Sequence, residues 1–297
     1  MSDLVTIASG ALTAQINPLG AELWSLTDGE GREYMTDADP AFWTGHAPIL
    51  FPIVGMLNDG RYRLDDRTYA LPKHGLARTS SFAVVATEPA FVHFQLTDSE
   101  QTRTVYPFAF ALDLRFRVAA MTLHVEAQVT NSGAVPMPFS FGFHPAFAWP
   151  LPDGGAKADH RVVFAEPEPQ PIRRIDPPTG LLLDQTFATP VDGRTLVPDA
   201  ALFEADALIW DRLASGSARL ESPRGAAIEV AFPDTSMLGI WQKPGAAYLC
   251  IEPWQGIADP VGFAGDLRDK PGIVMLPPGE ARRFRMDVTV TPAALDV

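Results

Sequence analysis

Two residues in distant parts of the chain have the side chains that proton-transfer chemistry requires. His144 ends the stretch SFGFH, and Glu252 lies within the apolar run YLCIEPW. An imidazole and a carboxyl together supply a general acid and a general base when their surroundings adjust their pKa values. Whether the two act together depends on the elements that hold them.

His144 follows a segment in which aromatic and small residues alternate. In an extended chain Ser140, Gly142 and His144 point to one side, and the phenylalanines at 139, 141 and 143 point to the other. The aromatic side is expected in the core, so the imidazole lies on a face kept shallow by serine and glycine, as the floor of a ligand pocket would be. The alternative is a histidine hydrogen-bonded to a backbone carbonyl at a strand end.

Glu252 interrupts an otherwise apolar strand. Extended geometry puts Tyr248, Cys250, Glu252 and Trp254 on one face. A carboxyl in such surroundings is either paired or has a raised pKa, and a raised pKa suits a general base near neutral pH. The alternative is a structural ion pair with Lys243 or an arginine. Trp254 either stacks on a sugar ring or belongs to the core.

The stretch LPKHGLAR supplies a second histidine, His74, in a turn whose glycine permits close approach of the backbone. Lys73 and Arg78 add positive charge there. The alternative is a histidine exposed on a surface loop.

Asp206 interrupts the segment FEADALIWD, where its alternative role is to cap a turn. Hydrolysis by paired carboxylates would need an acidic partner for Glu252, and Asp206 or Asp259 could serve. A metal site is disfavoured because the chain lacks HxH and HxxxH spacings. The chain also lacks a GxSxG elbow and a glycine-rich phosphate loop, which argues against serine hydrolases and nucleotide-binding enzymes.

The pattern of apolar residues predicts an all-β protein, a large antiparallel β-sandwich or barrel. Period-two alternation indicates half-buried strands, and the 28 prolines disfavour helices. The predicted strands are 12–16, 81–87, 91–96, 110–118, 122–130, 227–232 and 284–290.

The domain organisation is predicted from the chain length and from the distribution of prolines and of alternating apolar residues. A chain of 297 residues fits one large domain or two ordinary ones. Residues 145–200 contain ten prolines and little alternation, which suggests an excursion over the surface. We interpret it as an insertion in one domain spanning residues 1–297, because no linker of Gly or Ser separates two halves.

Charge and hydropathy restrict the partners and the compartment. The net charge of −13, without a basic run, argues against nucleic acid and anionic membranes as partners. The sequence shows no signal peptide and no apolar run of membrane-spanning length. One cysteine rules out an internal disulfide and fits a reducing compartment. We therefore expect a soluble, cytoplasmic protein, either a monomer or a homodimer.

Taken together in chain order, several of these motifs resemble the aldose 1-epimerase, or galactose mutarotase-like, family, and its LacX-like branch in particular. The resemblance extends over about residues 8–290. The motifs are INPLGAELWSL, APILFPIVG, KHGLAR, YPFAF, PMPFSFGFHPAF, ALIWD and IEPWQG.

The resemblance implies a β-supersandwich with a carbohydrate cleft and an isomerase that interconverts the α and β anomers of an aldose. It implies that His144 is the general acid and Glu252 the general base. His74 would hold the sugar near its ring and anomeric oxygens, and Asp206 would bind sugar hydroxyls. Trp254 is a further candidate for sugar binding. Neither a cofactor nor a metal is required.

One residue departs from the family pattern. The family commonly has an arginine where this chain has Met56, and methionine donates no hydrogen bond. Arg61, Lys73 or Arg78 would have to compensate. Two other hypotheses therefore stay open: a sugar-binding or sensing protein with little catalysis, and a glycoside-processing enzyme of the same architecture. The sequence leaves the aldose, and whether it is phosphorylated, open.

Overall fold

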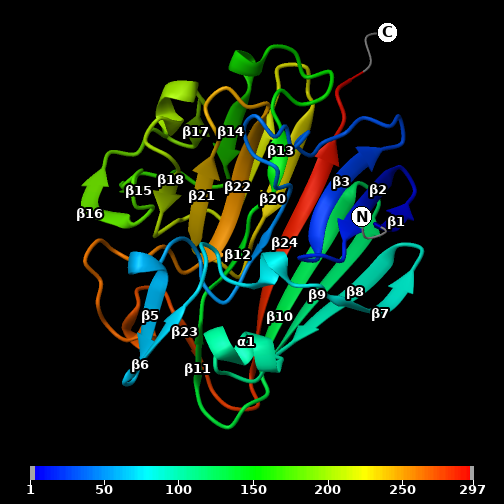
Figure 1. Cartoon of the computed structure of the whole chain (residues 1–297). Coiled ribbons are helices and arrows are strands. Elements are labelled where there is room, and N and C mark those ends of the chain that lie inside the picture. The colour runs from blue at the N-terminus through cyan, green and yellow to red at the C-terminus, as the bar shows by residue number, and fades with distance from the viewer. Residues whose placement is uncertain (1–3, 295–297) are drawn as a thin grey trace.

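The computed structural model describes residues 4–294, and antiparallel β-strands dominate it (Figure 1). The only α-helix in that range is the short α1 (Glu100–Val105), which begins with a capping box at Ser99. No helix within residues 4–294 is long and apolar enough to cross a bilayer. Single 3₁₀ turns occur at Asn58–Gly60, Ala77–Thr79, Lys157–Asp159, Ala200–Phe203 and Leu267–Asp269.

The larger of the two main sheets has nine strands within the described residues. Strand β24, red in Figure 1, runs through its middle and pairs with β10 and β20. In sheet order the strands are β17 (Thr195–Leu196), β14 (Arg161–Phe164), β19 (Ser217–Glu221), β20 (Ala227–Ala231), β24 (Ala281–Thr291), β10 (Thr122–Asn131), β9 (Phe110–Ala119), β8 (Phe91–Thr97) and β7 (Ala83–Glu88).

The second main sheet has eight strands within the described residues, and it positions His144 and Glu252. Strand β13 (Ala146–Ala148) joins it by pairing with β22 beyond the end of β12. The other strands, in sheet order, are β16 (Leu182–Phe187), β15 (Ile172–Ile175), β18 (Leu208–Trp210), β21 (Met237–Trp241), β22 (Tyr248–Gln255), β12 (Phe141–Phe143) and β4 (Ile49–Leu50).

Three smaller sheets complete the architecture of residues 4–294. One is a three-stranded meander that contacts β8 and β9. The other two are two-stranded. The strands of the meander are β1 (Val5–Ser9), β2 (Leu12–Asn17) and β3 (Glu22–Asp28); the pairs are β5 (Arg61–Leu64) with β6 (Arg67–Ala70) and β11 (Met137–Phe139) with β23 (Val274–Leu276).

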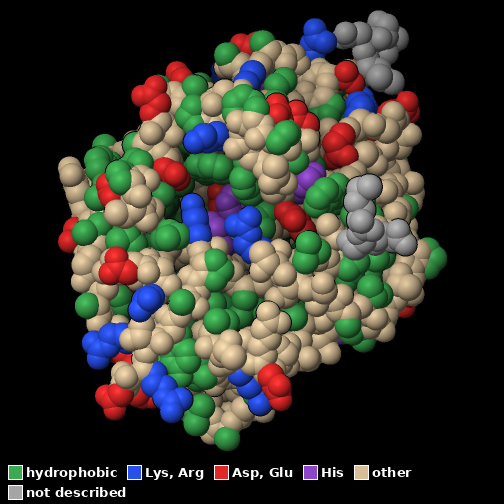
Figure 2. Space-filling model, in the orientation of Figure 1, with side chains coloured by type: hydrophobic (Ala, Val, Ile, Leu, Met, Phe, Trp, Pro, Cys, Tyr) green, Lys and Arg blue, Asp and Glu red, His purple; other side chains and the backbone are tan. Residues whose placement is uncertain are grey.

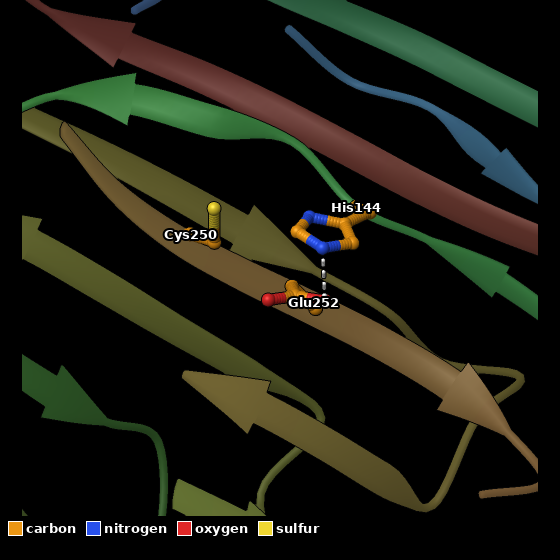
Figure 3. A group of neighbouring side chains, drawn as sticks. All are labelled: His144, Cys250 and Glu252. Carbon is orange, nitrogen blue, oxygen red and sulfur yellow. Dashed lines mark ion pairs between the residues drawn. The ribbon is translucent and has the colours of Figure 1, made fainter. Parts of the chain in front are cut away.

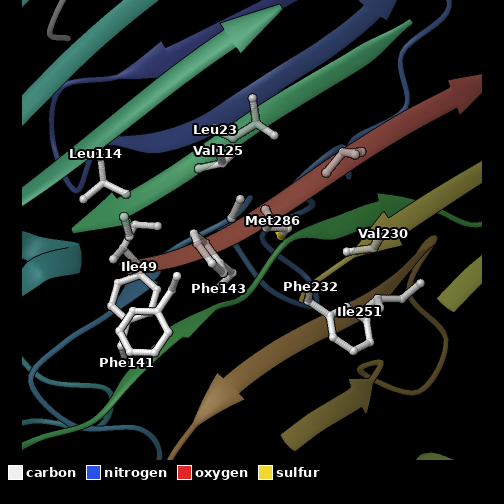
Figure 4. Packing of buried hydrophobic residues seen from close by; sticks show 14 of the residues in the cluster. Leu23, Ile49, Leu114, Val125, Phe141, Phe143, Val230, Phe232, Ile251 and Met286 are labelled. Carbon is white, nitrogen blue, oxygen red and sulfur yellow. The ribbon is translucent and has the colours of Figure 1, made fainter. Parts of the chain in front are cut away.

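The core lies between the two main sheets, where their apolar faces meet (Figure 4). Phe141 of β12 stacks on Phe284 of β24 with ring centroids 4.8 Å apart. The predicted aromatic side of residues 139–143 therefore faces the core, as the alternation indicated. Because the phenylalanines fill the space between the sheets, the small residues of the same segment face outward, toward the surface of the second sheet.

The all-β prediction is confirmed. Each of the seven predicted strands is present, and the largest difference at a strand end is three residues, where 284–290 was predicted and Ala281–Thr291 is observed. The surface excursion predicted for residues 145–200 is wrong. That segment contributes β13 to β17 to the two main sheets, and Val162, Phe164 and Ile172 in it are buried. That one domain spans residues 1–297 stays a prediction.

Candidate active site

Strand register places His144 directly opposite Glu252. Gly142 of β12 pairs with Trp254, and Ala146 of β13 pairs with Cys250. The same register continued across the two residues between β12 and β13 sets position 144 against position 252. Opposed residues of an antiparallel pair project to the same face, so the imidazole and the carboxyl meet above the sheet.

The two side chains are in contact and almost fully buried. His144 Nε2 lies 3.2 Å from Glu252 Oε2, and the residues are 7% and 1% exposed (Figure 3). Within residues 4–294, His144 Nδ1 has no hydrogen-bond partner, and Glu252 Oε2 has none beyond this contact with His144 Nε2. Buried polar atoms without partners cost about 1–3 kcal/mol each, so they persist where a ligand or a reaction needs them.

Burial governs the protonation of this pair. Burial, together with the positive charge of Lys73, lowers the pKa of His144 to about 3. Burial also raises the pKa of Glu252 well above its usual range, although Lys73 opposes that shift. A lowered imidazole pKa and a raised carboxyl pKa leave a wide pH range in which the pair holds a single proton.

Trp254 forms the floor of the cleft beside this pair. An added Cβ at Gly142 would lie 2.6 Å from Trp254 Cδ1, and one at Gly239 would lie 2.5 Å from its Cη2. The indole therefore lies flat over the glycines of both neighbouring strands, β12 and β21. These glycines keep the sheet surface shallow, which matches the prediction made from the serine and glycine spacing around residue 142.

His74 reaches the same cleft from the turn after β6. Its Nδ1 accepts a hydrogen bond from the backbone of Gly55 at 3.1 Å, so in the neutral ring Nε2 carries the proton. Burial lowers its pKa well below the usual value, and His144 lies edge-on at 5.6 Å. Gly75 (φ +78°) fixes this turn, because an added Cβ would lie 2.3 Å from the carbonyl oxygen of Phe51.

Asp206 lines the cleft just before β18, and its backbone has an unusual conformation. Its φ is +63°, and His74 has a φ of +68°. Left-handed conformations are uncommon for residues other than glycine and cluster at functional sites. Asp206 Oδ1 also accepts from Ala207 N at 2.7 Å, and its carbonyl accepts from Arg174 Nη1 at 2.9 Å. The turn-capping alternative for Asp206 thus coexists with a place in the cleft.

Six of the residues singled out from the sequence line one cleft: His74, Arg78, His144, Asp206, Glu252 and Trp254. Lys73 lines it as well. Figure 2 shows this face of the molecule, with histidine side chains at the bottom of a central hollow and Lys or Arg side chains at its edge. The cleft therefore combines a buried imidazole–carboxyl pair with positive charge at its mouth.

Sequence reasoning missed the aromatic and apolar walls of the cleft. Trp43 stacks on His144 with centroids 5.0 Å apart, and Trp241 meets the same imidazole edge-on at 5.9 Å. Trp43 lies in an irregular segment without periodicity, so no pattern pointed to it. Trp241 ends β21, where alternation from Gly239 would have placed it on the cleft face. The remaining apolar lining is Val54, Ile175, Ala207, Ile209 and Ala258.

The positions of Arg61 and Asp259 exclude two roles that the sequence had left open. Arg61 lines a different cavity, so of the three suggested cations only Lys73 and Arg78 lie at the cleft. Asp259 forms a buried ion pair with Lys270 and accepts from Asn58 N, so it is not a second carboxylate for Glu252. Met56 packs on the 176–181 turn: an added Cβ at Gly180 would lie 2.8 Å from Met56 Cγ.

A further side chain, that of Cys250, lies beside His144 and Glu252. Its sulfur and one ligand atom each of His144 and Glu252 lie within 4.8 Å of one another (Figure 3). Histidine, cysteine and glutamate are all ligands of divalent transition metals. The spacing rules applied to the sequence did not find this group, because His144 comes from the β12–β13 connection and the other two from β22.

Comparison with models of protein families identifies the family of this chain. The model of the family described as aldose 1-epimerase matches residues 3–289, and the chain belongs to that family.

The chain is also similar to the chromosomal protein LacX of Lactococcus lactis subsp. lactis. The two are 34% identical over 289 residues, which cover 94% of this chain and 96% of that protein.

Solved structures show the same architecture over nearly the whole chain. A galactose mutarotase related enzyme from Lactobacillus acidophilus superposes with a TM-score of 0.90 at 31% identity, covering 99% of both chains. A galactose mutarotase-like protein from Lactobacillus casei also gives 0.90, at 30% identity, covering 97% of this chain and all of the other. The antiparallel sandwich is therefore the galactose mutarotase-like fold.

Proposed function

We propose that the protein is an aldose 1-epimerase, or mutarotase, that interconverts the α and β anomers of a free aldose by general acid and base catalysis. The observation that carries the proposal is the contact between His144 and Glu252, 3.2 Å apart at the bottom of a cleft. Family membership and the mutarotase-related neighbours support the same activity.

The reaction needs one group that removes a proton and one that supplies a proton. Glu252 takes the proton from the anomeric hydroxyl while His144 protonates the ring oxygen, so the C1–O5 bond breaks and C1 becomes an aldehyde. Rotation about C1–C2 presents the other face of the aldehyde, and ring closure with the roles reversed gives the second anomer. No net proton is consumed, which suits a pair that holds one proton.

Burial sets the starting form of the pair. The uncharged form, with the proton on Glu252, is favoured in a dry site. Transfer of that proton to His144 across the 3.2 Å contact gives the carboxylate and imidazolium that start ring opening. Lys73 stabilises the carboxylate electrostatically. A bound sugar supplies the hydrogen bonds that Glu252 Oε2 and His144 Nδ1 lack.

The remaining cleft residues orient the sugar. His74, whose Nδ1 is already occupied, can donate from Nε2 to a sugar oxygen. Asp206 accepts from sugar hydroxyls. Trp254 offers an apolar surface on which the C–H face of a pyranose stacks. Arg78, half-buried at the edge of the cleft, donates to oxygens that the family's usual arginine would otherwise contact.

NMR exchange spectroscopy on a panel of free aldoses tests the proposal. The wild-type chain should accelerate anomer exchange with saturation, whereas Glu252→Gln and His144→Asn should each lower the rate by about 10²-fold or more. Matched controls on β10, Glu126→Gln and His124→Asn, should keep the wild-type rate. A fold that is intact by thermal unfolding, with exchange unaffected in Glu252→Gln, would contradict the proposal.

Met56 favours a second candidate, a sugar-binding protein with little catalysis. Its thioether provides no hydrogen-bond donor at the position where the family commonly has arginine. The two candidates differ in one measurable respect. A binding protein would raise its melting temperature with a sugar but would leave the rate of anomer exchange at its uncatalysed value.

A further inference from the structure

The proton-transfer pair shares its buried surroundings with a thiol. Cys250 and Glu252 are two residues apart on β22, so their side chains leave the same face of the sheet. His144 stands above them from the neighbouring connection. The sulfur, one imidazole nitrogen and one carboxyl oxygen all lie within 4.8 Å of one another (Figure 3).

This separation is close to what a tetrahedral metal ion requires. With Zn–S near 2.3 Å and Zn–N or Zn–O near 2.0–2.2 Å, neighbouring ligand atoms are about 3.5 Å apart. The most widely separated of the three atoms therefore need to approach one another by up to about 1.3 Å, which side-chain rotation can supply. His144 and Glu252 line the cleft, so the fourth ligand position of the ion would face the cleft.

Two independent features of the site point to a ligand. The first is His144 Nδ1, which has no hydrogen-bond partner within residues 4–294, together with Glu252 Oε2, which has none beyond its 3.2 Å contact with His144 Nε2; both side chains are more than nine-tenths buried. The second is charge: a thiolate and a carboxylate together neutralise a divalent cation, and a neutral imidazole adds no charge. Such a cluster is net neutral, as an apolar site between Trp43 and Trp241 requires.

We propose that His144, Cys250 and Glu252 form a binding site for a thiophilic divalent cation such as Zn²⁺, and that the bound cation blocks the cleft. Binding releases the thiol proton to solvent and occupies the imidazole and carboxyl that ring opening needs. The cation is therefore an inhibitor of the reaction and not its cofactor. The inhibition rests on the proposed mutarotase function, whereas the binding does not.

Direct titration tests the binding without reference to catalysis. Calorimetry with Zn²⁺ should give one site in the wild-type chain, and Co²⁺ should produce the near-ultraviolet absorption of a cobalt–thiolate bond. Loss of an outer partner of a metal site typically costs 10–100-fold in affinity, so Cys250→Ala, which removes a ligand, should weaken Zn²⁺ binding by at least about 100-fold. It should also abolish the Co²⁺ band.

Two controls make the result specific. Zn²⁺ could also bind at a surface pair of histidine and carboxylate, such as His124 with Asp287. His124→Ala removes that pair and should leave the Zn²⁺ affinity unchanged. Cys250→Ser keeps the shape of the side chain, with an oxygen in place of the sulfur, so it replaces the alanine variant if that variant unfolds. Zn²⁺ affinity that is equal in the wild type and both Cys250 variants would overturn the proposal, as would the absence of a thiolate band.

Anomer exchange then tests the inhibition. Zn²⁺ should stop exchange by the wild-type chain, EDTA should restore it, and Cys250→Ala should stay active at the same Zn²⁺ concentration. Inhibition that is equally strong in Cys250→Ala would contradict the proposal. If the wild-type chain binds Zn²⁺ through Cys250 but accelerates no anomer exchange, the mutarotase proposal fails and the metal site stands.

Discussion

Substitution of Gly239 by alanine should displace the floor of the cleft. The added Cβ would lie 2.5 Å from Trp254 Cη2 and 2.6 Å from Cζ2, about 1 Å inside ordinary van der Waals contact. Gly239 is buried in the middle of β21 and its φ is not left-handed, so the backbone itself tolerates alanine. The indole must therefore move, and because Trp254 lines the cleft, a shift away from β21 narrows the space proposed for the sugar.

The size of the effect follows from this overlap. Overpacking of a close-packed site costs about 1–3 kcal/mol of unfolding free energy. A displacement of about 1 Å beside reacting groups costs up to about 10²-fold in rate. We expect Gly239→Ala to lower kcat/KM for anomer exchange by about 10- to 100-fold, mostly through KM, with a lower melting temperature.

A matched control and a double-mutant cycle isolate the cause. Gly216 is an exposed glycine with no atom within 4 Å of an added Cβ, so Gly216→Ala should leave both activity and stability nearly unchanged. In a Trp254→Ala background the cost of Gly239→Ala should vanish, because the clashing ring is gone. Equal losses in both backgrounds, or wild-type kinetics in Gly239→Ala, would refute the reasoning.

Three further predictions concern buried charge. The value of kcat/KM, which reports the free enzyme, should not fall as the pH drops through 6.5. His144 takes up the second proton of the pair only near about pH 3, and an acid limb near 6.5 would contradict this. Burial raises the pKa of Glu252 in the folded state above its ordinary value of 4.5. Between pH 4.5 and the folded-state pKa, the carboxyl therefore lowers the unfolding free energy by about 1.4 kcal/mol for each pH unit. Glu252→Gln should therefore raise the melting temperature more at pH 8 than at pH 4, which thermal unfolding at the two pH values measures. An equal shift at both pH values would contradict a raised pKa of the Glu252 carboxyl. Lys270→Met leaves Asp259 as an unpaired buried charge and should lower the unfolding free energy by about 3–5 kcal/mol in denaturant titrations, whereas a loss below about 1 kcal/mol would contradict a buried pair.

The strands of this protein were predictable because they are long enough to show their period. Strands β9 and β10 have ten residues each, and alternation over that length is unambiguous. The strands between residues 145 and 200 have two to six residues and prolines between them. A period of two cannot be recognised over two to four residues, which is why that segment resembled a surface excursion.

The proposed catalytic pair, His144 and Glu252, was predictable in part for the same reason. The alternation around residues 140–144 and 248–254 indicated which side chains leave the core face. The register that sets position 144 against position 252 comes from pairing between segments more than 100 residues apart, which local patterns do not encode. In the sequence, the order of the motifs and the family resemblance carried that step.

Other features of the site arise from contacts that no local pattern contains. Trp43 packs on His144 from an irregular segment about 100 residues earlier in the chain. The approach of Cys250 to His144 depends on how β13 pairs with β22. The role of Gly239 depends on the size of Trp254 on the neighbouring strand.

Kinetics of the single and double variants of the proton-transfer pair give the most direct test that His144 and Glu252 act as one unit. The measurement is the rate of anomer exchange by NMR for His144→Asn, Glu252→Gln and the double variant. If the two groups share one proton-transfer step, each single variant should lose about as much as the double variant. A double variant slowed by the product of the two single effects, or a single variant as fast as the wild type, would contradict the account.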